Sequence, residues 1–210
     1  MASDDFFLTL CPDPLYLDLL CLDPGCVKAI EKIEKGLRLH LNPESEILLL
    51  LRARDWRSHL VGATAALLFK PTPAVAQGLW NAFDARSWVS PQLAVSALRL
   101  DPLFSEEART RIERAFAALS HTPPRRGIWQ RLSGAKPRPA RWESNVDAKG
   151  IAALFYLCGL KEECNSWFGI FKQDARVLSL VEDYGEQGDQ FARNWTIRLN
   201  QLSLPREFEG

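Results

Sequence analysis

A short polar residue followed directly by proline recurs along the first half of the chain, and each such pair marks a place where a helix can begin. The pairs are Asp13-Pro14, Asp23-Pro24, Asn42-Pro43, Thr72-Pro73, Ser90-Pro91 and Asp101-Pro102. The polar side chain can accept a hydrogen bond from a free amide of the first helical turn. Proline supplies a helical φ and lacks the amide N–H that would have no partner within the helix at this position. The same dipeptides also begin turns, so the residues that follow must decide.

Those following residues are spaced for helices. Apolar side chains recur at intervals of three and four, as in Val75, Leu79 and Phe83, which is the period of an α-helix and not the alternation of a strand. No hairpin turn separates β-rich runs anywhere in the chain. The sequence therefore predicts an all-α fold.

The expected helices come in pairs with a regular step. First helices are expected near Cys26, Arg57 and Val89, and second helices near Pro43, Pro73 and Ser105. A pair thus repeats after roughly 31 residues, which is somewhat shorter than the roughly 40 residues of many two-helix repeats. Identical residues follow a similar offset, since Arg54, Trp56 and Ser58 correspond to Arg86, Trp88 and Ser90.

The segment Asp55–Leu67 is rich in small residues that would let adjacent helices approach closely. In this segment and its repeat the chain resembles the HEAT-like class of α-solenoids, most clearly over residues 24–119 and more loosely over 143–203. The resemblance implies an α-solenoid-like array of antiparallel helix pairs with an extended binding surface. An irregular helical bundle is the alternative.

Three regions are expected. Residues 1–119 form the helix-pair repeats, residues 120–142 form a Pro-rich basic loop, and residues 143–210 supply C-terminal helices that complete the same domain. These last helices are expected over 146–160, around 175–184 and around 191–202. The sequence does not specify their order in space.

The repeat starts are one candidate binding site. Arg57, His59 and Trp88 would lie along one edge if equivalent positions of stacked repeats line up, and Trp and Arg are enriched in protein interfaces. The alternative is that each Trp is wedged between neighbouring helix pairs, with the charged residues serving as caps.

The basic loop is the other candidate. It holds six basic residues and no acidic one, whereas the whole chain carries 26 of each. Arginines interleaved with tryptophans could grip carboxylates or phosphates while the indoles fill a pocket. The alternative is that the loop covers the acidic body through ordinary ion pairs. The candidate residues of the loop are Arg125, Arg126, Trp129, Arg131 and Trp142.

Catalysis has little support. The nucleophile-elbow, phosphate-loop, dinucleotide and zinc-protease motifs are missing, so no cofactor or catalytic residue is predicted. The three histidines are far apart and the five cysteines include no CxxC, which indicates reduced thiols and no metal site. One enzyme class suits the resemblance: DNA-repair glycosylases of HEAT-like fold, whose clefts carry aromatic residues and a carboxylate.

The preferred hypothesis is a non-catalytic protein-binding module, such as an adaptor, a chaperone-like factor or an immunity-type inhibitor. A nucleic-acid binder is the alternative, which the zero net charge disfavours. The acidic N-terminus and the lack of a long apolar run point to a cytoplasmic protein without membrane insertion. The oligomeric state is left open.

Overall fold

The computed structural model describes residues 15–21, 25–70, 72–120, 147–202 and Leu204. Within these ranges the regular structure is helical and no strand occurs, which confirms the all-α prediction. The helices are α2 (Leu15–Cys21), α3 (Cys26–Leu39), α4 (Pro43–Arg52), α5 (Trp56–Leu67), α6 (Pro73–Asp84), α7 (Ser90–Leu100), α8 (Phe104–Ser120), α10 (Ala148–Cys158), the short 3-10 helix η1 (Glu162–Cys164), α11 (Asn165–Lys172) and α12 (Ala175–Gln201).

The helix starts lie where the sequence places them. The three first helices α3, α5 and α7 and the three second helices α4, α6 and α8 each begin within one residue of the expected position. Two of the polar caps also form as expected. The side chain of Asn42 accepts a hydrogen bond from the amide of Ser45, and that of Thr72 accepts one from the amide of Val75.

Two other polar residues that precede proline form different hydrogen bonds. Ser90 is already the first residue of α7 and has no capping bond; its hydroxyl instead donates to the carboxylate of Asp147. Asp101 accepts a hydrogen bond from the amide of Leu103, so a turn precedes α8. Its other oxygen accepts the indole N–H of Trp80 at 2.6 Å. Asp13-Pro14 and Asp23-Pro24 lie outside the described residues.

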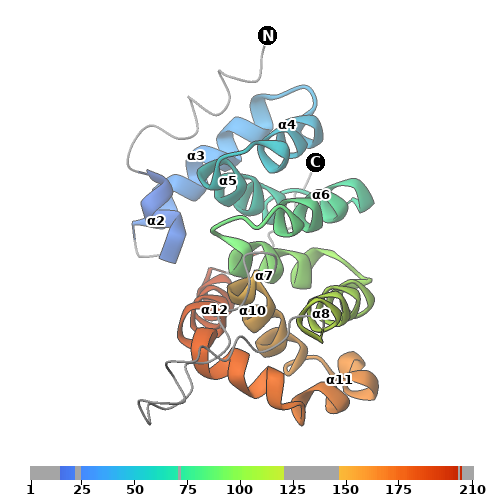
Figure 1. The fold of residues 1–210 in the computed structure, drawn as a ribbon. Coiled ribbons are helices and arrows are strands. Elements are labelled where there is room, and N and C mark those ends of the chain that lie inside the picture. Colours follow the sequence, from blue (N-terminus) through green and yellow to red (C-terminus); the bar gives the residue numbers. More distant parts are fainter. Residues whose placement is uncertain (1–14, 22–24, 71, 121–146, 203, 205–210) are drawn as a thin grey trace.

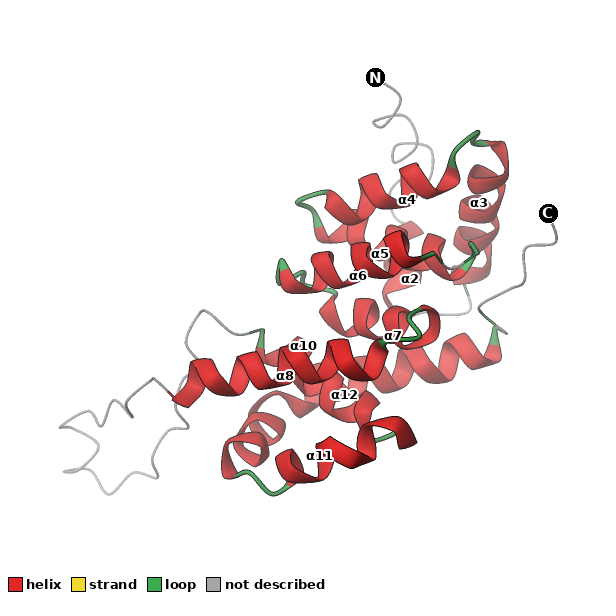
Figure 2. Cartoon of the chain, turned by 90° about the vertical axis from the view of Figure 1, so that its right-hand side faces the viewer, coloured by secondary structure: helices red, strands yellow, loops and turns green. Residues whose placement is uncertain are grey.

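The helices stack in two layers. Helix α5 contacts both α3 and α7 in one layer, and α4 contacts α6 in the other. Each second helix also packs on the first helix of the next pair, α4 on α5 and α6 on α7. Figures 1 and 2 show the resulting array, which runs from α3 and α4 at one end to α11 and α12 at the other. Each pair buries its apolar face against its neighbours, because one pair alone cannot cover it.

Small residues bring α4 and α5 close together. Gly62 of α5 is buried, and a Cβ atom at this position would lie 3.1 Å from the Cβ of Leu50. The neighbouring Ala63, Ala65 and Ala66 are fully buried. The expectation that the small-residue segment permits close helix packing is confirmed.

Two C-terminal helices extend the array. Helix α10 packs on α7 and α8, and α12 packs along α10 and contacts α7. The segments expected around 175–184 and 191–202 belong to one continuous helix, α12. Gly188 lies at its crossing with α10, where an added Cβ would be 2.4 Å from the carbonyl oxygen of Lys149. This packing stabilises the helix through a stretch of low helix propensity.

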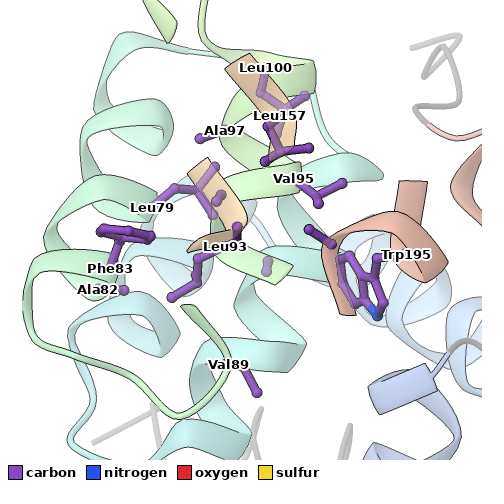
Figure 3. Close-up of a cluster of buried hydrophobic side chains, with 14 of the residues drawn as sticks. Leu79, Ala82, Phe83, Val89, Leu93, Val95, Ala97, Leu100, Leu157 and Trp195 are labelled. Atoms are coloured by element: carbon purple, nitrogen blue, oxygen red, sulfur yellow. The ribbon is translucent and has the colours of Figure 1, made fainter. Parts of the chain in front are cut away.

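Buried apolar side chains form one cluster across the described residues, from Leu19 to Leu204. Figure 3 shows the part where α6, α7, α10 and α12 meet, with Leu79, Phe83, Leu93, Leu157 and Trp195 among the labelled side chains. The indole N–H of Trp195 lies 3.2 Å from the carbonyl oxygen of Leu19 and 3.0 Å from that of Leu20. Helix α12 is therefore attached to the end of α2, so the first and last described helices of the chain contact each other.

Candidate functional site

Two tryptophans at equivalent places in successive helix pairs meet at one edge of the array. Trp56 is the first residue of α5, and Trp88 lies in the short connection between α6 and α7. Their ring centroids are 4.9 Å apart and the ring planes are inclined by 59°. The 32-residue offset seen in the sequence thus corresponds to a direct contact in space.

A basic side chain from α5 lies on one side of this pair. The guanidinium carbon of Arg57 is 4.8 Å from the ring centroid of Trp56 and 5.0 Å from that of Tyr16 in α2. These distances are in the range of cation–π contacts. Asp55 accepts a hydrogen bond of 3.2 Å from Arg57 and holds the guanidinium beside both rings.

A second basic side chain lies on the other side. The ammonium nitrogen of Lys149, in α10, is 4.5 Å from the ring centroid of Trp88 and 5.5 Å from that of Phe191 in α12. It also donates a 2.6 Å hydrogen bond to the carbonyl oxygen of Trp88. The six side chains form a continuous row, here named the cation–aromatic patch: Tyr16, Arg57, Trp56, Trp88, Lys149 and Phe191.

The electrostatics of Lys149 follow from this packing. Burial lowers the pKa of Lys149, because removal from water disfavours the charged ammonium, and the negative charge of Asp147 acts in the opposite direction. Asp147 also caps α10, since its side chain accepts the amide of Gly150. The cap residue of α10 therefore supports the charge of the lysine that contacts Trp88.

The two tryptophans differ in exposure. Trp56 is half-buried among its neighbours, which fits the wedge interpretation, whereas Trp88 is 50% exposed and does not. The side chain of Arg57 is 43% exposed. The patch therefore presents a large aromatic surface beside a basic group, which is the composition of binding hot spots.

His59 is not part of this surface. It is 4% exposed, and its Nε2 lies 2.7 Å from the carbonyl oxygen of Ala53. Because a carbonyl can only accept, Nε2 carries the proton and Nδ1 accepts the hydroxyl of Ser87 at 2.8 Å. The expectation of a partner-binding His59 is corrected to a structural one: the ring ties the start of α5 to the connection that carries Trp88.

The sequence did not indicate three members of the patch. Tyr16, Lys149 and Phe191 come from α2, α10 and α12, far from the two tryptophans along the chain. No local pattern marks them, since only the packing of these helices against α5 and α7 brings them together. The side chain of Phe191 is half-buried.

The loop candidates lie outside the described residues, which stop at position 120 and resume at 147. They are Arg125, Arg126, Trp129, Arg131 and Trp142. Their predicted role in binding stays a prediction.

The described residues offer little for covalent or metal chemistry. Burial, followed by the nearby Cys164, raises the pKa of Cys158, so its thiolate is strongly disfavoured at neutral pH. In the described ranges no three His, Cys, Asp or Glu side chains are grouped so that they could hold a metal ion. Nor does any helix in these ranges combine the length and apolarity needed to cross a membrane.

Comparisons with protein-family models, with curated proteins and with solved structures found no match to this chain.

Proposed function

We propose that the protein is a non-catalytic protein-binding module, an adaptor, chaperone-like factor or immunity-type inhibitor of helical-repeat architecture. Its partner binds on the cation–aromatic patch. The observation that carries the proposal is the exposure of Trp88, a side chain whose burial in a complex would remove a large apolar area from water. Contacts with Trp56 and Lys149 hold the ring in place, so ordering it on binding costs little conformational entropy.

The patch also suits a particular kind of partner. Arg57 and Lys149 lie next to aromatic rings at the two ends of the Trp pair. A partner surface with an apolar or aromatic residue beside a carboxylate would complement both features, because a guanidinium and a carboxylate pair with specific geometry. The expected partner is therefore an acidic protein surface with an apolar centre.

A capture experiment with matched variants tests the proposal. Tagged wild-type protein, Trp88→Ala and Leu103→Ala are each incubated in native lysate, and the proteins retained in stoichiometric amount are identified. Leu103 is the control because it is a similarly exposed large apolar residue, at 55%, in the connection between α7 and α8. Trp88→Ala should weaken binding of the retained partner by about 2 kcal/mol or more, the size of a hot-spot loss. Equal retention by all three proteins would contradict the proposal.

The loop is tested separately. A combined alanine variant at Arg125, Arg126, Trp129 and Arg131 should weaken the same complex if the loop contributes to the interface. An unchanged affinity would restrict the interface to the patch.

Binding of single-stranded nucleic acid is a second candidate, favoured by the alternation of cations and aromatic rings in the patch. Bases stack on such rings while basic groups contact phosphates. Salt separates the two candidates: nucleic-acid affinity falls steeply between 50 and 200 mM salt, roughly tenfold or more for a few phosphate contacts, whereas an apolar protein interface responds weakly. A nuclease-sensitive, salt-labile complex would favour this candidate. Asp55, the carboxylate that holds Arg57 beside the rings, would then be the first residue to replace.

A further inference from the structure

The cation–aromatic patch starts at the helix into which residues 1–14 lead. Tyr16, the first member of the patch, is the second residue of α2, and α2 packs on α5. The ring centroid of Tyr16 is 5.6 Å from that of Trp56, which in turn is 4.9 Å from that of Trp88. The chain therefore enters the described structure two ring contacts away from the half-exposed Trp88.

Residues 4–7 have the composition that complements the patch. They read Asp-Asp-Phe-Phe, so two carboxylates directly precede two phenyl rings. A phenyl ring suits the open side of Trp88, because aromatic pairs favour offset and edge-to-face contacts. The patch calls for an apolar or aromatic residue beside a carboxylate, and this short segment of the same chain combines the two.

The aromatic contact has to provide most of the attraction, because the basic groups of the patch already have carboxylates nearby. Asp55 accepts a hydrogen bond from Arg57, and a hydrogen bond with Tyr16 raises the pKa of Arg57. Burial lowers the pKa of Lys149, and the charge of Asp147 opposes this effect. A guanidinium has five N–H groups, so Arg57, whose side chain is 43% exposed, has further donors for an incoming carboxylate.

The connection is long enough for this contact. Seven residues separate Phe7 from Leu15, where the described structure starts. A chain of that length spans up to roughly 25 Å, which is more than two ring contacts require. A short tether also gives the segment a local concentration of about 1 mM or more, so even a weak contact keeps it on the patch for much of the time.

A second acidic aromatic segment, Glu207-Phe208-Glu209, provides a matched comparison. It follows Leu204, whose amide donates to the carbonyl oxygen of Leu199 at 3.0 Å. Leu199 lies about 12 Å along α12 from Phe191, the patch member on that helix, because an α-helix rises about 1.5 Å per residue. This segment therefore starts outside the patch, whereas residues 4–7 lead into a helix that belongs to it.

We propose that residues 4–7 bind on the cation–aromatic patch of the same chain and cover it until a partner displaces them. Phe6 or Phe7 packs on the exposed side of Trp88, and the preceding carboxylates face Arg57. This inference rests on the proposed function of the patch, since the segment competes there with the partner. The apparent affinity for the partner is lowered in proportion to the fraction of molecules whose patch is uncovered.

The indole N–H resonance of Trp88 in the isotopically labelled full-length protein reports this contact without any partner. The resonance is assigned by its loss in Trp88→Phe. Phe6→Ala combined with Phe7→Ala should shift it, because the ring current of the covering phenyl group is removed, while the resonance of the buried Trp80 stays in place. Phe208→Ala is the control and should leave both resonances unchanged.

Asp4→Asn combined with Asp5→Asn is the second variant, since it keeps both phenylalanines and any packing they provide. It should shift the Trp88 resonance in the same direction by a smaller amount. A synthetic peptide of residues 2–10, titrated into the double phenylalanine variant, should move the resonance back saturably with a Kd of about 1 mM or below. An unchanged Trp88 resonance in both variants, a shift only in Phe208→Ala, or no saturation by the peptide up to roughly 5 mM would overturn the proposal.

Partner capture separates this proposal from the proposed function. If both hold, the double phenylalanine variant should bind the captured partner at least about fivefold more tightly than the wild type, the opposite of Trp88→Ala. A Trp88 shift in the segment variants with no captured partner would refute the proposed function and leave the segment contact standing. A captured partner with an unchanged Trp88 resonance would refute the segment contact and leave the proposed function standing.

Discussion

The rings of Trp56 and Trp88 contact each other although 32 positions separate them in the sequence, and this contact joins the starts of two successive first helices. The contact lies at the border of the shared hydrophobic cluster, because Trp56 packs against that cluster while Trp88 is half-exposed. It therefore contributes to stability through one local pair while leaving an aromatic surface open to a partner.

The Trp pair should show a measurable coupling. Replacing both residues by alanine should destabilise the protein by less than the sum of the single replacements, with a difference of about 0.5–1.5 kcal/mol. Urea unfolding followed by far-ultraviolet circular dichroism gives the free energy of each variant. The pair Trp56→Ala and Leu103→Ala is the control, and its effects should add. Additive effects for Trp56 and Trp88 would mean that the ring contact contributes nothing.

Arg111 should be the most sensitive charged residue described. It is buried, is bound by Asp84 and Glu107, and lies over the ring of Trp80 at 4.2 Å. Arg111→Met should lower the free energy of unfolding by about 1–2 kcal/mol, because Asp84 and Glu107, both about one-third exposed, lose the hydrogen bonds that this guanidinium donates. The exposed Arg109 on the same helix is the control, and Arg109→Met should change the free energy by less than about 0.5 kcal/mol. Similar losses for both variants would refute the special role of Arg111.

His59 should make stability depend on pH below neutrality. Burial lowers its pKa from the ordinary value of 6.5, so the unfolded chain takes up a proton at a pH where the folded protein does not. The contribution of neutral His59 to the free energy of unfolding is fully present above pH 6.5. It falls as the pH drops toward the pKa of His59 in the folded protein, by at most about 1.4 kcal/mol per pH unit. His59→Gln removes the titration and should flatten the profile between pH 6.5 and 5. Unfolding curves across this range test it, and an unchanged slope in the variant would assign the pH dependence to other groups.

Two helical glycines should respond in opposite directions to alanine. At Gly188 the added methyl group would lie 2.4 Å from the carbonyl oxygen of Lys149, so Gly188→Ala should separate α10 from α12 and cost about 2 kcal/mol or more. Gly169 in α11 has nothing within 4 Å of an added Cβ. Gly169→Ala should stabilise the protein by about 0.5–1 kcal/mol, since alanine is the better helix former. Thermal melts of the two variants should therefore shift to opposite sides of the wild type.

The positions of the helices could be predicted because their causes are local. Asn42 and Thr72 cap α4 and α6 through bonds to amides three residues ahead, and the apolar spacing that follows fixes which face is buried. These interactions span about one helical turn, so they are readable in the sequence itself. The 32-residue offset predicted that the repeat starts lie along one edge, but not that the rings of Trp56 and Trp88 contact each other.

The candidate sites depended on contacts that the sequence does not contain. Lys149 and Phe191 join the patch only because α10 and α12 pack beside α7, and His59 is buried only because Ala53 and Ser87 close around it. The sequence by itself determined where the helices of the first 120 residues start and that the fold is all-α. The tertiary structure alone decided which polar and aromatic side chains are exposed, because exposure depends on helices far apart in the chain, whereas helix formation depends on neighbours within a turn.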